Sequence, residues 1–252
     1  MTYTPQELMV AAAAREIGDR EVVFVGMRLP LLAFALAKRT HAPRAVGLFE
    51  NGIVRDEPAR ELLYTMSDPP NVRGATWCTG LFNVMSLLSQ GAVHLGFIGG
   101  AQVDRFGNLN TSYIGDFQRP QTKLPGSGGG ADIASLAQRY LIIMEHERRR
   151  LVEKVDYVTS PGYGDGGDWR ARVGLPRGGP AALITTLGVI RFEAQTKEAY
   201  LASFHPHTSV AEILESTGWP LRVSANAGAT PAPTDEELRV IRELDPEGFW
   251  TK

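Results

Sequence analysis

One glutamate in the chain is placed as a reactive carboxylate would be. Glu50 stands between the apolar run Ala45-Val46-Gly47-Leu48-Phe49, which predicts a buried strand, and Asn51-Gly52, which favours a turn with positive φ. Such a turn would hold Glu50 at the carboxyl end of a sheet, where open α/β folds bind their ligands. A carboxylate there can act as a base, a metal ligand or a nucleophile. From these residues alone, a solvated loop glutamate is the commoner interpretation, because short motifs often match by chance.

A glycine cluster offers backbone N–H groups that could bind an anion. It is Gly126-Ser127-Gly128-Gly129-Gly130, and it runs into a predicted helix over residues 131–136. Glycines let the backbone turn its N–H groups toward one point, and a helix start adds positive charge, so the cluster suits a phosphate, a carboxylate or a thioester oxyanion. The alternative is a flexible loop. The cluster is neither a Walker loop nor a dinucleotide fingerprint, because it lacks the Gly-Lys-Ser/Thr ending and the polar segment 116–120 before it is not predicted to be a strand.

A second pair of glycines follows another predicted strand. Gly99-Gly100 begins where the strand ending at Ile98 stops, and glycines there allow close approach of a ligand or of other backbone. Gln102 could donate a hydrogen bond to a substrate oxygen. Asp104 and Asn108 predict a turn held by bonds from side chain to backbone, which is a structural role.

Other reactive residue types form no complete site. His146 has no second histidine four residues on, so a solvated polar face is favoured over a metal site. His205 and His207 are two potential metal ligands without a third. Cys78 has no base near it in sequence and is expected to be a buried bystander. No Gly-x-Ser-x-Gly segment occurs at a strand-to-helix turn, which argues against an α/β-hydrolase.

The elements that would position these residues begin with an alternation of helices and strands. A capping signature at Thr4-Pro5-Gln6-Glu7 predicts a helix to about residue 17, and a strand over 21–27 follows. A helix to about residue 39 and the strand at 45–50 complete an α-β-α-β order. This order implies a parallel sheet with crossover helices.

The later part of the chain predicts more antiparallel structure. Residues 56–73 predict an irregular surface excursion, and 225–233 predict a loose linker. The further predicted strands and helices cover 81–88, 92–100, 140–144, 155–158, a hairpin at 180–192, 200–204, 209–217 and 234–244. The fold class is therefore α/β, with an open, mostly parallel sheet and flanking helices, more antiparallel in the C-terminal half. We expect a single domain over residues 1–252.

The composition is that of a globular protein with nearly equal numbers of acidic and basic residues. The 252 residues are 43% apolar and include 27 glycines, which suits an α/β protein with many tight turns. A net charge of −2, from 26 basic and 28 acidic residues, gives no reason to expect nucleic acid or a membrane as a partner. A single cysteine excludes an internal disulfide. With no signal peptide and no membrane-spanning run, we expect a cytoplasmic protein.

Taken together, these motifs resemble a known family. The chain resembles the β subunits of family I coenzyme A transferases, with a fold of the CoA-transferase/NagB kind, and among them the glutaconate CoA-transferase kind most closely. The resemblance covers nearly the whole chain in ordered blocks: Leu29-Pro30, Glu50-Asn51-Gly52, Gly99-Gly100-Ala101-Gln102-Val103-Asp104, Gly107-Asn108, Gly126-Ser127-Gly128-Gly129, Met144-Glu145-His146-Glu147-Arg148-Arg149, residues 154–162 and Thr217-Gly218. So many blocks in order make the match specific, whereas Glu-x-Gly alone would be weak.

The resemblance implies a ping-pong acyl transfer in which Glu50 is the nucleophile and carries CoA as a glutamyl thioester. The glycine clusters, with Asn51, Gly52 and Gln102, would then bind the substrate, the CoA or the oxyanion. The resemblance also implies a separate α subunit, in a heterotetramer or larger assembly. Acyl-CoA and a short dicarboxylic or 3-oxo acid would be the substrates. No metal or bound organic cofactor is implied, because coenzyme A esters act as co-substrates.

Two alternatives stay open beside the transferase. A CoA-ester hydrolase or decarboxylase on the same fold would use Glu50 as a general base or only to bind substrate. A non-catalytic partner subunit would stabilise an active α chain without using Glu50 at all. Phe49 stands where many relatives carry serine or another small residue, which leaves the substrate's identity more open than the mechanism.

Overall fold

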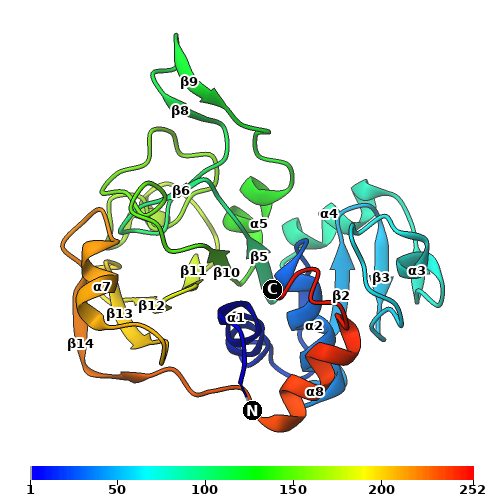
Figure 1. Cartoon of the computed structure of the whole chain (residues 1–252). Coiled ribbons are helices and arrows are strands. Elements are labelled where there is room, and N and C mark those ends of the chain that lie inside the picture. Colours follow the sequence, from blue (N-terminus) through cyan, green and yellow to red (C-terminus); the bar gives the residue numbers. More distant parts are fainter. Residues whose placement is uncertain (1) are drawn as a thin grey trace. The chain divides into compact units, whose positions relative to one another are not determined.

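A computed structural model describes residues 2–252, which form two compact units (Figure 1). The first unit contains residues 2–97 and 231–252, and the second contains residues 98–230. The single domain expected over residues 1–252 stays a prediction, because the compactness of two units does not decide whether either folds alone. Met1, which belongs to that range, lies outside the described residues.

The first unit is a mixed sheet with helices. Its strands lie in the order β5-β1-β2-β3-β4, with β1 parallel to β2 and β5, and β3 antiparallel to β2 and β4. Its elements are α1 (Pro5–Ala14), β1 (Val22–Phe24), α2 (Leu29–Arg39), β2 (Val46–Phe49), β3 (Ile53–Arg55), α3 (Pro69–Val72), β4 (Trp77–Cys78), α4 (Leu81–Ser89), β5 (Leu95–Ile98, whose last residue opens the second unit) and α8 (Asp235–Leu244). The predicted opening order of α-β-α-β is confirmed.

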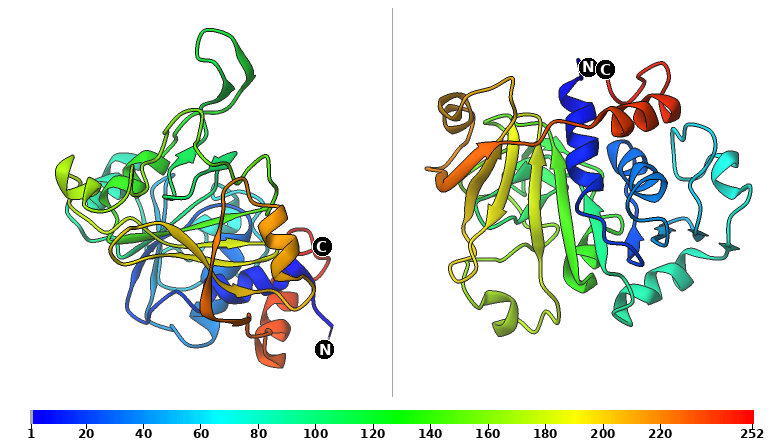
Figure 2. Two further views of the ribbon diagram at one scale, coloured as in Figure 1. Left: turned by 90° about the vertical axis from the view of Figure 1, so that its left-hand side faces the viewer. Right: turned by 90° about the horizontal axis from the view of Figure 1, so that it is seen from below.

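The helices α1, α2 and α8 pack together, although α8 is about 200 residues from the others in sequence (Figure 2). Capping boxes begin two of them: Thr4 with Glu7 in α1, and Thr234 with Glu237 in α8. Both boxes follow from the sequence signature of Thr followed three residues later by Glu. In α1 every side chain from Leu8 to Ala14 is buried, because its alanines let neighbouring elements approach on all sides.

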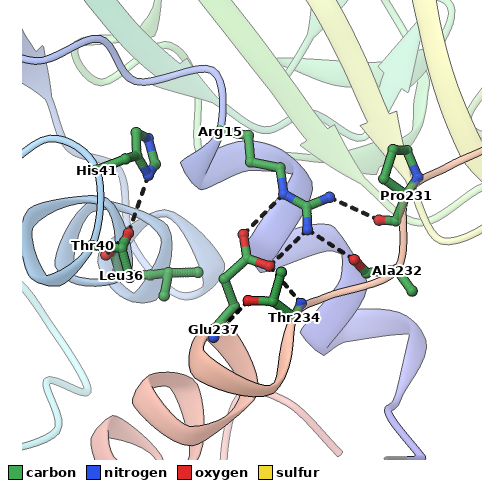
Figure 3. A network of polar contacts seen from close by, with 8 residues as sticks. All are labelled: Arg15, Leu36, Thr40, His41, Pro231, Ala232, Thr234 and Glu237. Carbon is green, nitrogen blue, oxygen red and sulfur yellow. Dashed lines mark hydrogen bonds and ion pairs between the residues drawn. The ribbon is translucent and has the colours of Figure 1, made fainter.

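Arg15, at the C-cap of α1, ties the returning C-terminal segment to the N-terminal helix (Figure 3). Its guanidinium donates to the Glu237 carboxylate through Nε at 2.9 Å and Nη2 at 2.6 Å. It also donates to the carbonyl oxygens of Pro231 at 2.8 Å and Ala232 at 2.9 Å. A planar fork with several donors satisfies all four bonds at once, which the single ammonium of lysine cannot do.

We predict that Arg15→Lys lowers the free energy of unfolding by about 1–2 kcal/mol, because it removes the paired bonds to Glu237. Urea denaturation of the full chain measures this loss. The matched control is Arg239→Lys, which alters an exposed i,i+4 pair with Glu243 and should cost less than about 0.5 kcal/mol. Equal losses in the two variants would contradict the role given to Arg15.

The second unit has a mixed sheet and a projecting hairpin. Its main strands lie in the order β14-β13-β12-β11-β10, with β10 parallel to β11, β13 parallel to β14, and the other two pairs antiparallel. Its elements are β6 (Gln102–Val103), β7 (Leu109–Asn110), β8 (Tyr113–Gly115), β9 (Pro120–Lys123), α5 (Gly130–Leu136), β10 (Arg139–Met144), α6 (Trp169–Arg172), β11 (Pro180–Thr185), β12 (Gly188–Phe192), β13 (Ala199–Phe204), α7 (Val210–Glu215) and β14 (Arg222–Ala229). The β8–β9 hairpin extends away from the main strands of this unit (Figure 1).

The predicted fold class is confirmed, with local corrections. Residues 222–229 form β14, where a linker was expected over 225–233, because pairing with β13 outweighs a weak strand preference. Residues 155–158 form no strand, since the Asp156 N–H is taken by the Gln102 side chain at 3.1 Å. The polar segment 116–120, for which no strand was expected, leads into strand β9 at Pro120. No helix within residues 2–252 is both long enough and apolar enough to cross a bilayer.

Two histidines of the second unit, His146 and His205, are buried. The solvated position expected for His146 is therefore wrong. Its ring nitrogens pair with the hydroxyls of Thr185 at 2.9 Å and Thr217 at 3.0 Å. His205 pairs with the Thr230 hydroxyl at 3.0 Å and donates to the Thr185 carbonyl at 2.9 Å. Because both rings are buried among uncharged partners, the neutral form of each imidazole is favoured over the charged form.

We predict that stability falls as the pH drops from about 6.5 to about 4. Burial lowers the pKa of both His146 and His205 from 6.5 to about 4. The unfolded chain therefore binds protons in this window that the folded chain does not, and the loss approaches roughly 3 kcal/mol per histidine at the acid end. Urea denaturation across the pH window should show a shallower slope for His205→Asn than for the control His207→Asn, which changes an exposed imidazole. Equal slopes would contradict this account.

Candidate active site

Glu50 lies in a three-residue turn between β2 and β3. The Gly52 N–H donates to the Phe49 carbonyl at 2.9 Å, so that Glu50 and Asn51 occupy the centre of the turn. Gly52 follows at φ 100°, and Phe49 pairs with Ile53 across the hairpin. This is a turn followed by a glycine bulge, a common three-residue hairpin connection. The predicted strand, turn and positive φ are therefore confirmed.

Gly52 is required for steric reasons as well. A Cβ on Gly52 would lie 2.0 Å from the carbonyl oxygen of Thr79, and the Thr79 N–H donates to the Gly52 carbonyl at 2.8 Å. The segment after β4 is therefore in direct contact with the turn. Only a glycine fits this approach, which fixes the direction in which the turn presents Glu50.

The Glu50 carboxylate is half-buried and has no hydrogen bond or ion pair with any residue among 2–252. It stands at the carboxyl end of β2, one strand away from the end of β1, because β1 and β2 are parallel with Phe24 opposite Leu48. In open α/β sheets, ligands bind at this edge. A free carboxylate there can attack a carbonyl carbon or remove a proton.

The irregular excursion of residues 56–76 between β3 and β4 folds back on the turn. The Asn51 side-chain amide donates to the Met66 carbonyl at 2.9 Å, and the buried Asn71 amide donates to the same carbonyl at 2.7 Å. The buried Arg55 guanidinium holds both ends of the excursion by donating to the carbonyls of Glu57 at 2.8 Å and Asn71 at 2.6 Å. Asn51, predicted as a substrate-binding residue, thus positions the excursion beside Glu50.

In the second unit the two glycine clusters meet at neighbouring residues. The Ala101 N–H, next to Gly99-Gly100, donates to the Asn110 carbonyl at 3.0 Å. The Gly126 N–H donates to the Thr111 carbonyl at 2.8 Å. A Cβ on Gly100 would lie 2.8 Å from the Leu109 side chain, so this glycine serves close packing. The structure thus brings together two of the three predicted clusters within one unit.

The loop at Gly126-Ser127-Gly128-Gly129 keeps N–H groups available for a ligand. Gly126 and Gly128 have φ of 97° and 49°, and Gly129 precedes the seven-residue helix α5. The N–H groups of Ser127, Gly128 and Gly129 have no backbone or side-chain acceptor within residues 2–252. The buried Ser160 hydroxyl, also without a partner, lies 3.1 Å from where a Cβ on Gly130 would be. The loop therefore offers several unpaired donors.

Gln102 and Asp104 are held by their neighbours. The Gln102 oxygen accepts from the Asn110 amide at 2.8 Å, and its nitrogen donates to Asp156 at 3.1 Å, which leaves one amide N–H for another group. Asp104 accepts bonds from the N–H groups of Phe106 at 3.0 Å and Asn108 at 3.1 Å, as the predicted structural turn requires. Burial raises the pKa of the Asp104 carboxyl.

Two features of the first unit were not predicted from the sequence. Cys78, expected to be buried, is exposed on β4 opposite Ile53, because β4 is a two-residue edge strand. Arg28, after β1, has φ 66° and ψ −125°, a conformation that favours glycine. No sequence pattern marks a non-glycine residue in this conformation, so Arg28 could be found only from the structure. Among residues 2–252 no group of three or more His, Cys, Asp or Glu side chains could hold a metal.

Comparison with known proteins identifies the family. Residues 6–216 match the coenzyme A transferase family model. The chain is 38% identical over 244 residues to the B subunit of 3-oxoadipate CoA-transferase from Pseudomonas knackmussii, covering 96% of this chain and 94% of that protein. It is 38% identical over 256 residues to the B subunit of glutaconate CoA-transferase from Acidaminococcus fermentans, covering 97% of this chain and 93% of that protein.

Solved structures agree with these sequence relationships. The crystal structure of glutaconate coenzyme A-transferase from Acidaminococcus fermentans has a TM-score of 0.93 at 34% identity, covering 100% of this chain and 98% of that chain. The decarboxylase AibA/AibB has a TM-score of 0.86 at 30% identity, covering 98% of this chain and 97% of that chain. The chain belongs to the coenzyme A transferase family, and its predicted kinship with the β subunits of family I is confirmed.

We predict that Gly52→Ala lowers the free energy of unfolding by roughly 3 kcal/mol, because alanine resists the positive φ and its Cβ meets the Thr79 carbonyl. Urea denaturation measures the effect. Gly74→Ala is the matched control, since Gly74 has φ 72° in the same unit but its added Cβ would come only within 3.9 Å of Arg55. The control should cost about 1 kcal/mol. Equal costs would show that the contact with Thr79 does not constrain the turn.

Proposed function

We propose that this chain is the β subunit of an enzyme that moves CoA from an acyl-CoA to a carboxylic acid, with Glu50 as the nucleophile. The observation that carries the proposal is the unpartnered, half-buried carboxylate of Glu50 at the carboxyl end of β2. A structural carboxylate would be expected to have donors around it, whereas a nucleophile must remain free to attack.

The proposed reaction runs through two covalent states. The Glu50 carboxylate attacks the thioester carbonyl, the C–S bond breaks, and a mixed anhydride and CoA thiolate form. The thiolate then attacks the Glu50 carbonyl, which gives a glutamyl-CoA thioester and releases the donor acid as a carboxylate. The acceptor carboxylate takes CoA by the reverse of these steps. Each step exchanges one acyl–heteroatom bond for another, so the sequence needs no water, redox partner or metal.

We also propose a binding role for backbone donors of the second unit. We assign the N–H groups of Ser127, Gly128 and Gly129, together with Gly99-Gly100 and Gln102, to binding the substrate, the CoA or the oxyanion. Fixed N–H donors stabilise a developing oxyanion without reorganising during the reaction. Asn51 and Gly52 hold Glu50 in place, as their contacts with Met66 and Thr79 indicate.

The names of the relatives support a proposal for the substrate class and the partner. Two of them are named for 3-oxoadipate and glutaconate, which are dicarboxylic acids, and both are named as the B subunit of their enzymes. We therefore propose a short dicarboxylic or 3-oxo acid as substrate. We also propose a separate α subunit in a heterotetramer or larger assembly, with coenzyme A esters as co-substrates and no bound cofactor. The cytoplasmic location stays a prediction.

We predict that Glu50→Gln lowers kcat/KM for CoA exchange by at least about 10³-fold in the complex with the α subunit, because the amide cannot form the anhydride. Steady-state assays with acetyl-CoA and a panel of dicarboxylic acids measure the effect. Glu57→Gln, which changes an exposed glutamate of the excursion, serves as the control and should retain activity. An active Glu50→Gln complex would point to a non-catalytic role for this chain. Activity without any acceptor acid would point to a hydrolase or decarboxylase.

A further inference from the structure

Arg28 follows β1 at the same end of the parallel β1–β2 pair as Glu50. In the parallel pair of β1 and β2, Phe24 is opposite Leu48, and the next N–H, that of Val25, donates to the Leu48 carbonyl at 2.9 Å. Adjacent strands lie about 4.8 Å apart, and Arg28 and Glu50 follow the last paired residues, Phe24 and Leu48, by four and two positions, so both leave the sheet at the same pair of strand ends.

A second set of contacts joins the Arg28 side chain to the excursion of residues 56–76. Its guanidinium lies over the Trp250 ring at 5.4 Å, and the indole N–H of Trp250 donates to the Leu63 carbonyl at 3.0 Å. Leu63 is three residues before Met66, whose carbonyl accepts the amide of Asn51 at 2.9 Å. The excursion thus links the ring beneath Arg28 to the residue next to Glu50.

The aromatic ring beneath Arg28 is itself fixed by the C-terminal segment. The buried Asp245 carboxylate accepts the N–H groups of Phe249 at 2.7 Å, Trp250 at 2.9 Å and Thr251 at 3.1 Å. The Phe249 ring packs edge-on against Trp250 with ring centroids 4.7 Å apart. A ring held this firmly can keep a cationic side chain in one orientation at little further entropic cost.

Arg28 is free to bind an anion. Its guanidinium has no carboxylate partner within residues 2–252, and the residue is exposed. Its φ of 66° is a backbone conformation that glycine adopts with less strain than arginine. The backbone therefore gives no reason for an arginine here, and we look for the reason in its side chain.

We propose that Arg28 binds the remote carboxylate of a dicarboxylic acyl group while Glu50 attacks the thioester at its other end. This inference rests on the proposed function. A planar guanidinium pairs with a carboxylate through two parallel hydrogen bonds, which suits the far end of a short diacid. The phosphates of CoA lie beyond its pantetheine arm, far from the reacting carbonyl, so they are a poorer match for a cation at the same strand ends as Glu50. Arg28 thereby selects dicarboxylic over monocarboxylic substrates.

The test compares acyl-CoA donors of equal chain length with and without a second carboxylate. The complex of the chain with its α subunit is assayed with glutaryl-CoA against pentanoyl-CoA, and adipyl-CoA against hexanoyl-CoA. Arg28→Gly removes the guanidinium while suiting the backbone, and Arg28→Lys keeps the charge without the fork. Arg20→Gly is the matched control, because Arg20 is an exposed arginine at φ 71° just before β1, at the opposite end of that strand.

We expect Arg28→Gly to lower kcat/KM about 10- to 100-fold for the dicarboxylic donors and less than about threefold for the monocarboxylic donors. Arg28→Lys should fall between wild type and Arg28→Gly, and Arg20→Gly should match wild type. The melting temperature of Arg28→Gly should not decrease, which separates loss of binding from loss of folding.

Two results would overturn the assignment in distinguishable ways. Equal losses with both donor classes, or a wild-type complex without preference for the dicarboxylic donors, would remove Arg28 from substrate selection while leaving Glu50 as nucleophile. Failure of the wild-type complex to place CoA on Glu50 with any of the four donors would overturn the proposed function, and the assignment of Arg28 with it.

Discussion

The contact between Gly52 and the Thr79 carbonyl is the constraint on which the candidate site depends. Because no side chain fits between them, a glycine is needed for the turn after β2 to pack against the segment after β4, and in this packing Glu50 lies at the strand end. The adjacent parallel strand β1 ends at the same edge. The reactive carboxylate is thus positioned by backbone geometry and needs no partner for its own side chain.

Segments far apart in the sequence build the surroundings of that turn. The excursion of residues 56–76 reaches Asn51 through Met66, and the C-terminal segment reaches the excursion through the bond from Trp250 to Leu63. Arg15 and Glu237 join the same C-terminal region to the first helix. The last residues of the chain therefore belong to the same network of contacts as the turn that carries Glu50.

The sequence was informative where local patterns decide the structure. The strand and turn around Glu50, the capping signature at Thr4 and the start of the last helix at residue 234 were predicted correctly, because each depends on a few adjacent residues. The glycine loop before α5 was located in the same way. Family resemblance joined these patterns into one hypothesis, which the comparisons confirm at the level of the family.

The features that could not be predicted depend on contacts between residues far apart in the sequence. The strand β14 forms against β13 despite a weak pattern, and His146 is buried because two threonines from other segments satisfy its ring. The aromatic support of Arg28 comes from Trp250, over 200 residues away, and such tertiary pairing is not displayed by a single sequence.

The measurement that tests the central claim most directly is mass spectrometry of the chain after incubation of its complex with acyl-CoA. Borohydride is added to trap the intermediate, and the peptide that contains Glu50 is then mapped. A CoA adduct on Glu50, reduced by borohydride to an alcohol at that side chain, is the result the account predicts. Turnover of the acyl-CoA with no modification of Glu50 would contradict it and leave the carboxylate as a base or a binding group.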